Sequence, residues 1–242
     1  MDTQSRLSAK RLALVVVLAF ASLAFMVVLR YLVSGKFTHG YLVWNLVLAA
    51  VPVGFAALGA KALASGISRR KKIIYASLAF LAWLAFYPNA PYIFTDFIHV
   101  IRRSNLGAPA ARWLSELDLL WFDIVLNAAF AFVGHYLGLI SMYITHCTMS
   151  RLFGKATGWA LLVPAMLLSG FGIHLGRFSR FNSWDLVFSP IAAIKAGAKT
   201  MSNPSALWFS FAFALFIALT YLIHYLVNGA FGSDESNANT GA

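Results

Sequence analysis

The sequence predicts an all-α membrane protein, a polytopic bundle of transmembrane helices with five or six spans. Apolar side chains make up 60% of its 242 residues and charged side chains only 11%, and the mean hydropathy is +0.75. A soluble domain carries about 25% charged residues, so this chain could not cover a water-facing surface. Several of its apolar runs also reach the ~20 residues that a helix needs to cross the hydrocarbon core.

The first predicted span covers residues 12–33 and follows three basic residues, which is the charge pattern of a signal sequence. The apolar run is too long for a signal peptide and no small-residue cleavage site follows it, so we interpret it as an uncleaved span. Asn203 and Pro204 suit the N-cap and first residue of the last span. The other full-length runs are residues 41–60, 119–140, 157–176 and 204–227.

The segment 73–101 is interrupted by Pro88-Asn89-Ala90-Pro91. Two prolines three residues apart remove two amide donors and disfavour helix at the residues before them. Such a break is tolerated at membrane depth where protein or a wet cavity satisfies the freed backbone groups. The segment is therefore either one kinked span or a re-entrant hairpin that enters and leaves on the same side.

The distribution of Lys and Arg favours the hairpin. Six simple spans with a cytoplasmic N-terminus put ten bases inside and nine outside, whereas a re-entrant segment 73–101 puts fifteen inside and four outside. Cytoplasmic loops carry an excess of Lys and Arg, so the second arrangement is the expected one.

One membrane-embedded helical domain is predicted over residues 1–231, followed by a polar, disordered tail at 232–242 and containing a short interfacial helix at 190–201. The net charge of +11 comes from bases placed between apolar runs, where they meet anionic headgroups. We therefore expect membrane lipids as partners and no nucleic acid, which would need a polar domain. The single cysteine excludes an intramolecular disulfide. Cofactors and protein partners are not identified by the sequence.

Polar residues are predicted to gather at one leaflet. The segments 102–118 and 177–203 are separated by two crossings, so they lie on the same side of the membrane. A carboxylate inside a span costs about 2.5–3.5 kcal/mol, so such groups are rarely idle. The candidate base or catalytic residues are Asp96, Asp123 and Asp185, and the candidate binding residues are Asn89, His99, Arg177, Arg180 and Asn182.

Three interpretations of this cluster stay open. The carboxylates and arginines are either structural ion pairs, a substrate site in which Arg holds a phosphate or carboxylate, or part of a metal site. No metal ligand set is predicted, because Asp96-x-x-His99 alone is not a specific motif. His39 and His146 are expected in loops. The pairs Gly134/Gly138 and Gly172/Gly176 permit close helix packing, and we do not expect them to face each other.

Three motifs resemble, in order, a family of bacterial multi-pass membrane proteins, domain-of-unknown-function family thirteen-sixty-one. The resemblance covers residues 75–230 and implies an inner-membrane protein with no assigned activity. Tyrosine is usual where this chain has His174, which weakens His174 as a candidate. The motifs are the run from Pro88 to Asp96, Trp121-Phe122-Asp123, and the run from Gly172 to Phe178 with Arg180, Asn182, Ser183, Trp184 and Asp185.

The sequence thus predicts an integral membrane protein with a buried Asp/Arg/Asn site near one leaflet, the cytoplasmic one in the favoured topology. Three functions compete, and whether the protein is an enzyme stays open. It is a structural subunit held by Asp–Arg pairs, an enzyme acting on a lipid headgroup or phosphorylated lipid, or a small-solute transporter. The transporter ranks last because the two halves of the chain show no repeat.

Overall fold

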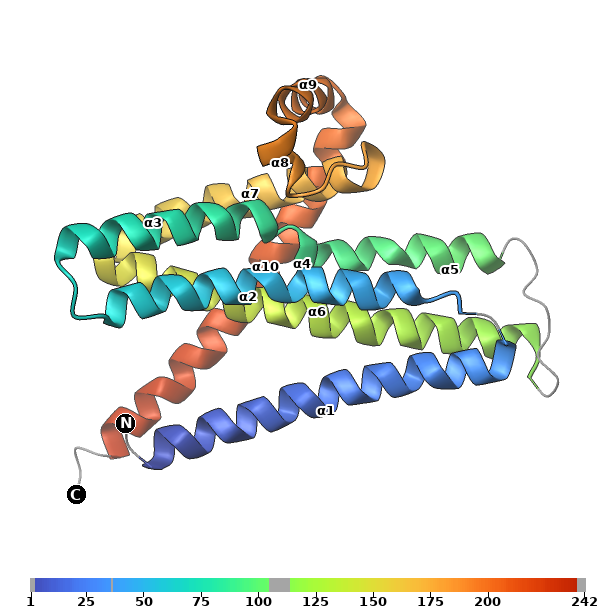
Figure 1. Ribbon diagram of the computed structural model, residues 1–242, viewed down its shortest axis with the longest axis horizontal. Helices are drawn as coiled ribbons and strands as arrows, with labels where there is room; N and C mark the ends of the chain where they lie inside the picture. Colours follow the sequence, from blue (N-terminus) through green and yellow to red (C-terminus); the bar gives the residue numbers. More distant parts are fainter. Residues whose placement is uncertain (1–2, 36, 105–113, 239–242) are drawn as a thin grey trace. The chain divides into compact units, whose positions relative to one another are not determined.

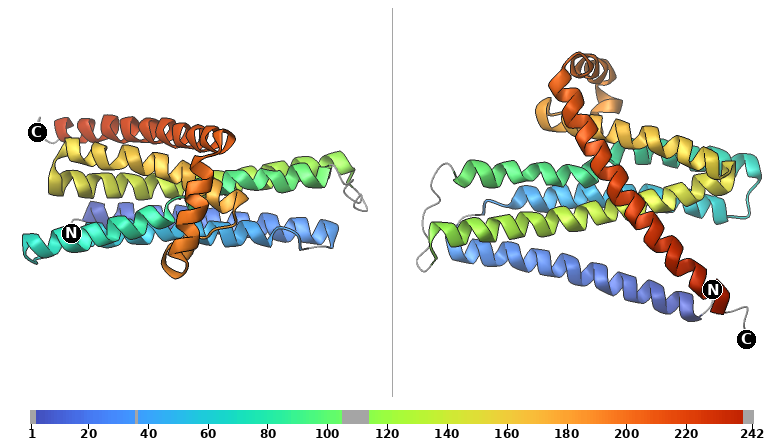
Figure 2. Two further views of the ribbon diagram at one scale, coloured as in Figure 1. Left: turned by 90° about the horizontal axis from the view of Figure 1, so that it is seen from above. Right: turned by 180° about the vertical axis from the view of Figure 1, so that it is seen from behind.

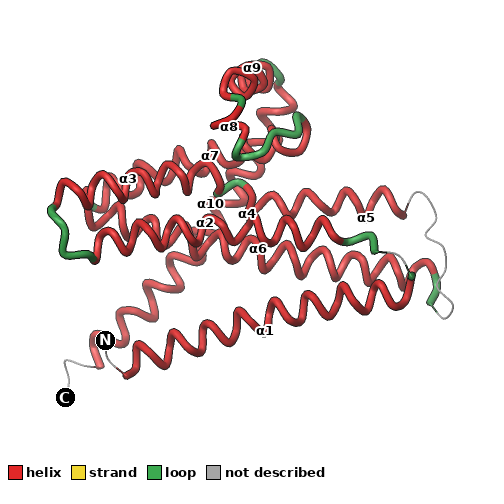
Figure 3. The backbone as a smooth tube through the Cα atoms, in the orientation of Figure 1, coloured by secondary structure: helices red, strands yellow, loops and turns green. Residues whose placement is uncertain are grey.

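The computed structural model describes residues 3–35, 37–104 and 114–238, and within these ranges it contains helices and no strand (Figures 1 and 3). The predicted all-α class is therefore confirmed. A shorter apolar stretch, Ala19–Ser34, lies in the first helix. Five helices of the described part are long and apolar enough to cross a membrane: Gly40–Ala64, Arg69–Arg102, Glu116–Phe153, Lys155–Phe178 and Pro204–Asn228.

Eleven helical elements follow one another in the described part of the chain (Figure 1). They are α1 (Thr3–Ser34), α2 (Gly40–Ala64), α3 (Arg69–Phe86), α4 (Asn89–Tyr92), the 3-10 helix η1 (Ile93–Asp96), α5 (Phe97–Ser104), α6 (Glu116–Phe153), α7 (Lys155–Phe178), α8 (Asp185–Phe188), α9 (Pro190–Met201) and α10 (Pro204–Ala238).

The chain divides into two compact units, each assembled from two stretches of sequence. Unit 1 consists of Met1–Val47 and Ile93–Gly134, and unit 2 consists of Leu48–Tyr92 and His135–Ala242. The long helices α2 and α6 each contribute one part to either unit. The single domain over residues 1–231 stays a prediction.

The beginning of α2 and the end of α5 lie at one end of unit 1. Asn45 of α2 is hydrogen-bonded to Asp96 of η1, and Tyr41, one turn earlier, contacts the ring of His99 in α5. This pairing is antiparallel, so the beginning of α2 and the end of α5 lie at the same end of unit 1. A hairpin returning toward residues 61–72 would have placed them at opposite ends. The structure therefore favours the single kinked span over the re-entrant hairpin.

The backbone at the Pro88–Pro91 break explains why the segment stays helical. Tyr87 keeps right-handed helical dihedral angles, Ala90 N–H donates to the carbonyl of Tyr87, and Tyr92 N–H donates to that of Pro88. The prolines thus remove two donors without reversing the chain. With one crossing here, the counts of Lys and Arg are ten and nine on the two sides, so they no longer decide which leaflet is cytoplasmic.

Unit 2 is built around a core of large side chains from α3, α6, α7 and α10. Trp83 and Tyr87 are fully buried beside Met142 of α6, and α10 packs along α7 (Figure 2). The indole N–H of Trp83 donates to Ser141 Oγ at 3.1 Å, so the core leaves this polar group satisfied. His146 was expected in a loop but lies inside α6, where its Nδ1 is 2.7 Å from the hydroxyl of Tyr221.

Two predictions from the sequence concern the last fifth of the chain. The predicted interfacial helix at 190–201 forms as α9, beginning at Pro190 after Ser189, and it exposes Ile191 and Ile194. Its place at the membrane interface stays a prediction. The backbone of α10 is helical through Ala238, within the segment 232–242 that was predicted as a disordered tail, and residues 239–242 lie outside the described ranges.

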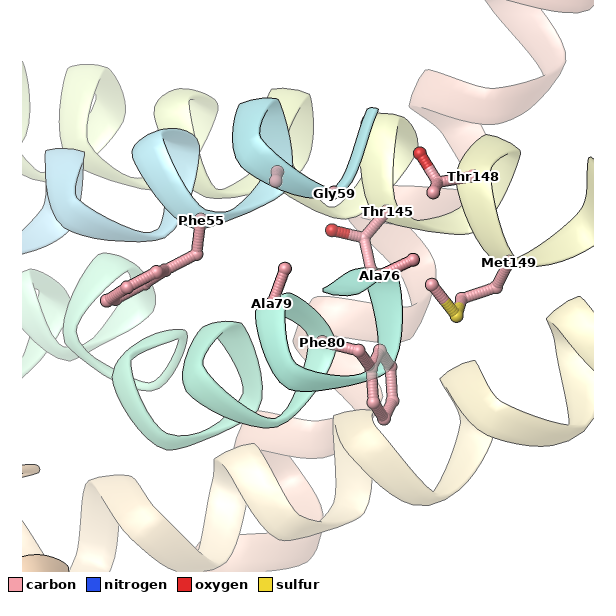
Figure 4. A pocket seen from close by; sticks show the side chains of 9 residues that line it. Phe55, Gly59, Ala76, Ala79, Phe80, Thr145, Thr148 and Met149 are labelled. Atoms are coloured by element: carbon pink, nitrogen blue, oxygen red, sulfur yellow. The ribbon is translucent and has the colours of Figure 1, made fainter. Parts of the chain in front are cut away.

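A small cavity lies between α2, α3 and α6 in unit 2, with a volume of about 10 Å³, close to what one water molecule needs (Figure 4). Thr145 and Thr148 of α6 both line it. Thr148 Oγ1 donates to the carbonyl of Ile144 at 2.8 Å, whereas Thr145 Oγ1 is buried without a hydrogen-bond partner in the part of the chain that the structure describes. The two threonines are therefore alike in position and different in hydrogen bonding.

Thr145→Val should raise the melting temperature in detergent by about 2–4 °C, because valine has the shape of threonine and removes a buried hydroxyl that costs about 1 kcal/mol. Thr148→Val is the matched control and should not raise it, because that change deletes a formed hydrogen bond. Differential scanning fluorimetry on both variants measures the effect. Equal shifts in the two variants would contradict the assignment.

Candidate functional site

The polar centre of unit 1 is the carboxylate of Asp123. Arg30 donates from Nε to Oδ1 at 2.7 Å and from Nη2 to Oδ2 at 3.2 Å, and His39 Nε2 lies 3.2 Å from Oδ1. All three side chains are buried, with 6%, 3% and 2% of Arg30, Asp123 and His39 exposed. A planar guanidinium on two carboxylate oxygens is the strong, orienting form of an ion pair. A buried polar site was predicted from the sequence, and one is present here around Asp123, but its arginine is Arg30 and not the predicted Arg177 or Arg180.

Three helix ends bring these residues together. Arg30 lies one turn before the end of α1, His39 directly precedes α2, and Asp123 lies seven residues, about 10 Å, inside α6. Thr38 Oγ1 is 3.1 Å from Nδ1 of His39. Since a carboxylate only accepts, His39 carries a proton on Nε2 and donates it to Asp123.

A second buried carboxylate, Asp96, lies deeper in unit 1. It is 1% exposed, accepts from Asn45 Nδ2 at 2.6 Å, and lies 3.9 Å from His99 Nε2. The ring of His99 is 37% exposed, so this pair joins a buried carboxylate to an accessible imidazole. Asp96 is the last residue of η1 and His99 lies in the first turn of α5, so the two side chains are one turn apart along a continuous helical stretch.

A ring contact and two hydrogen bonds connect the surroundings of the two carboxylates. Tyr41 packs on His99 with ring centroids 4.4 Å apart, and its hydroxyl donates to Asn127 Oδ1 at 3.2 Å. Asn127 Nδ2 in turn donates to the backbone carbonyl of Asp123 at 2.7 Å. Hydrogen bonds, ion pairs and this ring contact therefore connect eight residues of unit 1. We call them the unit 1 network: Arg30, His39, Tyr41, Asn45, Asp96, His99, Asp123 and Asn127.

One donor in this network has no acceptor. Nη1 of Arg30 is buried and finds no hydrogen-bond partner among the described residues, although Nε and Nη2 of the same group are held by Asp123. A buried donor left unsatisfied costs about 1–3 kcal/mol, and more for a charged group. Such a group in a native fold needs an explanation, and an anionic oxygen would supply its acceptor. Among the described residues, no group of three His, Cys, Asp or Glu side chains is arranged to hold a metal ion.

The remaining predicted residues lie in unit 2. Asn89 uses both amide hydrogens, donating to the carbonyl of Phe86 at 2.8 Å and to Ser183 Oγ at 2.9 Å. The Phe86 carbonyl needs this donor because Ala90 N–H bonds Tyr87 instead. The Pro-Asn-Ala-Pro and Asn-Ser-Trp-Asp motifs are thus neighbours within unit 2, and Asn89 acts there as a structural clamp.

The arginines of unit 2 differ in their surroundings. Arg177, at the end of α7, has its guanidinium carbon 5.9 Å from the ring centre of Tyr92 and Nη1 3.4 Å from its hydroxyl. Arg180 is exposed and has a φ of 57°, the left-handed conformation that a side chain of its size rarely adopts. Asp185 Oδ2 accepts from Asn182 N–H at 2.7 Å and fixes the turn before α8.

Glycines of both close-packing motifs receive the broken segment. A Cβ at Gly138 would lie 2.8 Å from Cβ of Ala90, and one at Gly172 would lie 2.9 Å from Cγ of Pro88. Gly176 likewise faces Tyr92. The missing side chains of these glycines therefore let the interrupted segment pack closely against α6 and α7, a role that the sequence did not indicate.

Four network residues were missed by sequence reasoning. Arg30 was counted with Lys36 as a loop charge, His39 was set aside as a loop residue, and Tyr41 and Asn45 were absorbed into an apolar span. The signal for Arg30 was available, because a base inside the run 12–33 is as costly as an acid inside a span. Of the predicted set, Asp96, His99 and Asp123 lie in unit 1, and Asn89, Arg177, Arg180, Asn182 and Asp185 lie in unit 2.

The family described as a protein of unknown function, DUF1361, matches residues 44–220 of the chain. No curated protein and no solved structure matches the chain. The match includes Asp96, Asp123 and the motif from Gly172 to Asp185, and it begins after Arg30, His39 and Tyr41.

Proposed function

The chain belongs to the DUF1361 family, and we propose that it acts on the phosphorylated headgroup of a membrane lipid. The observation that carries this proposal is the buried Nη1 of Arg30, a cationic donor without an acceptor. Phosphate oxygens are strong acceptors that match the planar guanidinium. In a bilayer, the anions within reach of a helix end are lipid headgroups. We place the protein in the bacterial inner membrane as a multi-pass protein, with this site near one leaflet.

Asp123 and His39 would position the anion-binding group. The fork of Arg30 is locked on Asp123, which fixes the direction of Nη1, and this pair is electrically neutral. His39 lies 3.2 Å from the same carboxylate and helps to hold it in place. Binding would thus be supported by orientation more than by excess charge.

Asp96 and His99 are the proposed acid–base pair. Asn45 holds one carboxylate oxygen of Asp96, and the partly exposed imidazole of His99 faces the other at 3.9 Å. A carboxylate that orients an imidazole is a common arrangement for proton transfer. In unit 2, four residues remain proposed headgroup contacts: the exposed Arg180 and Asn182, and also Arg177 and Asp185. The hydrogen bonds of Asn89 favour a structural role for that residue.

A structural role for the network is the second candidate. Asp123 accepts from both Arg30 and His39, and such a closed cluster is also what a helix clamp requires. The two candidates differ in whether Nη1 needs an external acceptor.

The test replaces Arg30 with lysine, which keeps a charge for Asp123 and removes the fork. The purified protein is exchanged into a phosphate-free detergent, and the lipid phosphorus that stays bound is measured per chain. We expect Arg30→Lys to lose the lipid phosphorus held at this site, because the loss of one charge-assisted hydrogen bond lowers its affinity about tenfold. The protein should remain folded, and phosphorus bound elsewhere on it should be retained. Arg102→Lys, at an exposed position of α5 that has no part in either proposed site, is the matched control and should retain the phosphorus at this site.

Asp96→Asn separates binding from chemistry. This variant should keep the bound phosphorus but stop any change in the lipids of a reconstituted total-lipid extract, followed by ³¹P NMR over time. Equal amounts of bound phosphorus in Arg30→Lys and in the unmodified protein would contradict the proposal and favour the structural role of the network.

A further inference from the structure

One end of unit 2 is strongly basic. The ends of α2, α3, α6 and α7 meet there, because Ile73 and Ala76 pack with Met149 and Leu152 and with Leu161 of α7. Six of the seven basic side chains at these helix ends are exposed, and Lys72 is partly exposed. They are Lys61, Arg69, Arg70, Lys71, Lys72, Arg151 and Lys155, which we call the basic end.

Few acids are available to neutralise the basic end. The sequence has no Asp or Glu between Leu48 and Tyr92 or between His135 and Trp184. The first acid of unit 2 is Asp185, beyond the far end of α7, and the only others are Asp234 and Glu235 in the last turns of α10. Even if both of these were near, seven bases would exceed two acids.

Four of the bases occupy the first turn of α3, where cations are unfavourable. The N-terminus of a helix carries a partial positive charge, and its first amide groups have no partner within the helix. Arg69, Arg70, Lys71 and Lys72 add four charges there, and Ser68 at the N-cap makes no side-chain hydrogen bond to the turn. An anion at this position would relieve the repulsion and accept from the amides.

The apolar surface of a membrane span begins directly beside these charges. Ile74, Tyr75, Leu78 and Leu81 follow on α3 and are between 46% and 59% exposed. A boundary between fixed cations and exposed apolar side chains matches the boundary between phosphate groups and acyl chains in a leaflet. A free phosphate or a nucleic acid would use the charges but not the apolar face.

We propose that the basic end of unit 2 binds the headgroups of anionic phospholipids, with the first turn of α3 as its centre. This surface is separate from the unit 1 network. Lys61 lies in the last turn of α2, a candidate span, so the basic end lies where this span ends. The proposal does not depend on the proposed lipid chemistry.

The experiment offers the delipidated full chain an equimolar mixture of phosphatidylglycerol and phosphatidylcholine and measures the ratio retained by mass spectrometry. We expect the unmodified protein to prefer phosphatidylglycerol, and Arg69→Gln with Arg70→Gln to lower that preference about tenfold, since each base near an anionic surface contributes to binding. The charge-conserving pair Arg69→Lys with Arg70→Lys is the matched control and should keep it. The preference should also fall with added salt.

Folding does not confuse the result, because removing cations from the start of α3 should leave the melting temperature unchanged or raised. Arg30→Lys should keep the phosphatidylglycerol preference, which distinguishes this proposal from the lipid chemistry. An unchanged preference in the glutamine pair would overturn the proposal. So would a roughly tenfold gain in Asp234→Asn with Glu235→Gln, which would show that the end of α10 occupies the surface.

Discussion

Asp123→Asn should lower the melting temperature of the purified protein by about 10 °C. The change leaves the guanidinium of Arg30 buried without its counter-charge, and breaking one side of a buried ion pair costs about 3–5 kcal/mol. The lost partner accepts both donors that Arg30 aims at it, at 2.7 and 3.2 Å. Thermal unfolding in detergent, followed by intrinsic fluorescence, measures the effect.

The matched control is Asp118→Asn on the same helix. Asp118 is exposed and accepts from the N–H and hydroxyl of Ser115, as a residue capping the beginning of α6. Its replacement should change the melting temperature far less than that of Asp123, because no buried charge is left behind.

A double replacement separates the charge from the packing. Arg30→Met with Asp123→Leu removes both charges together, and exchanging a buried ion pair for apolar side chains is often neutral or stabilising. We expect this variant to recover most of the stability lost in Asp123→Asn while losing the lipid phosphate that is proposed to bind Arg30. A double variant as unstable as Asp123→Asn would mean that the destabilisation does not arise from the uncompensated charge.

Gly170→Ala should destabilise unit 2 by about 3 kcal/mol, again near 10 °C in melting temperature. A Cβ at Gly170 would collide with the backbone carbonyl oxygen of Ser210 in α10 and would lie 3.0 Å from the backbone nitrogen of Ala214. Backbone atoms of a packed helix cannot move aside as a flexible side chain does, so α7 and α10 would have to separate.

Gly54→Ala is the control for helix propensity. Gly54 lies inside α2 with no atom within 4 Å of its would-be Cβ, so alanine meets no obstacle there and should stabilise the helix by up to about 1 kcal/mol. Opposite shifts in the two variants are expected in the same thermal assay. A neutral Gly170→Ala would contradict the close approach of α7 and α10.

Close packing at Gly170 was not predicted from sequence, and neither was the partner of Gly138 or Gly172. Glycine pairs four residues apart are frequent in a chain with 17 glycines, so their spacing alone does not identify what they face. The observed partners, Ala90 and Pro88, come from the interrupted segment 73–101. Only a structure places that segment against α6 and α7.

The sequence by itself determined the class of protein, most of the spans and the two carboxylates of the unit 1 network. Composition and run length depend on local residues and on the thickness of a bilayer, so helical spans and costly carboxylates such as Asp96 and Asp123 are visible without coordinates.

The tertiary structure decided the partners. Arg30 and Asp123 are 93 residues apart, and Asn45 and Asp96 are 51 apart. Hydropathy places both Arg30 and Asn45 within apolar runs, because it averages over neighbours in sequence and does not show which side chains meet. A buried ion pair is instead fixed by which helix faces meet. In unit 1, the contact between α1 and α6 brings Arg30 and Asp123 into one site. The antiparallel pairing of α2 with η1 and α5 favours one kinked span for the interrupted segment.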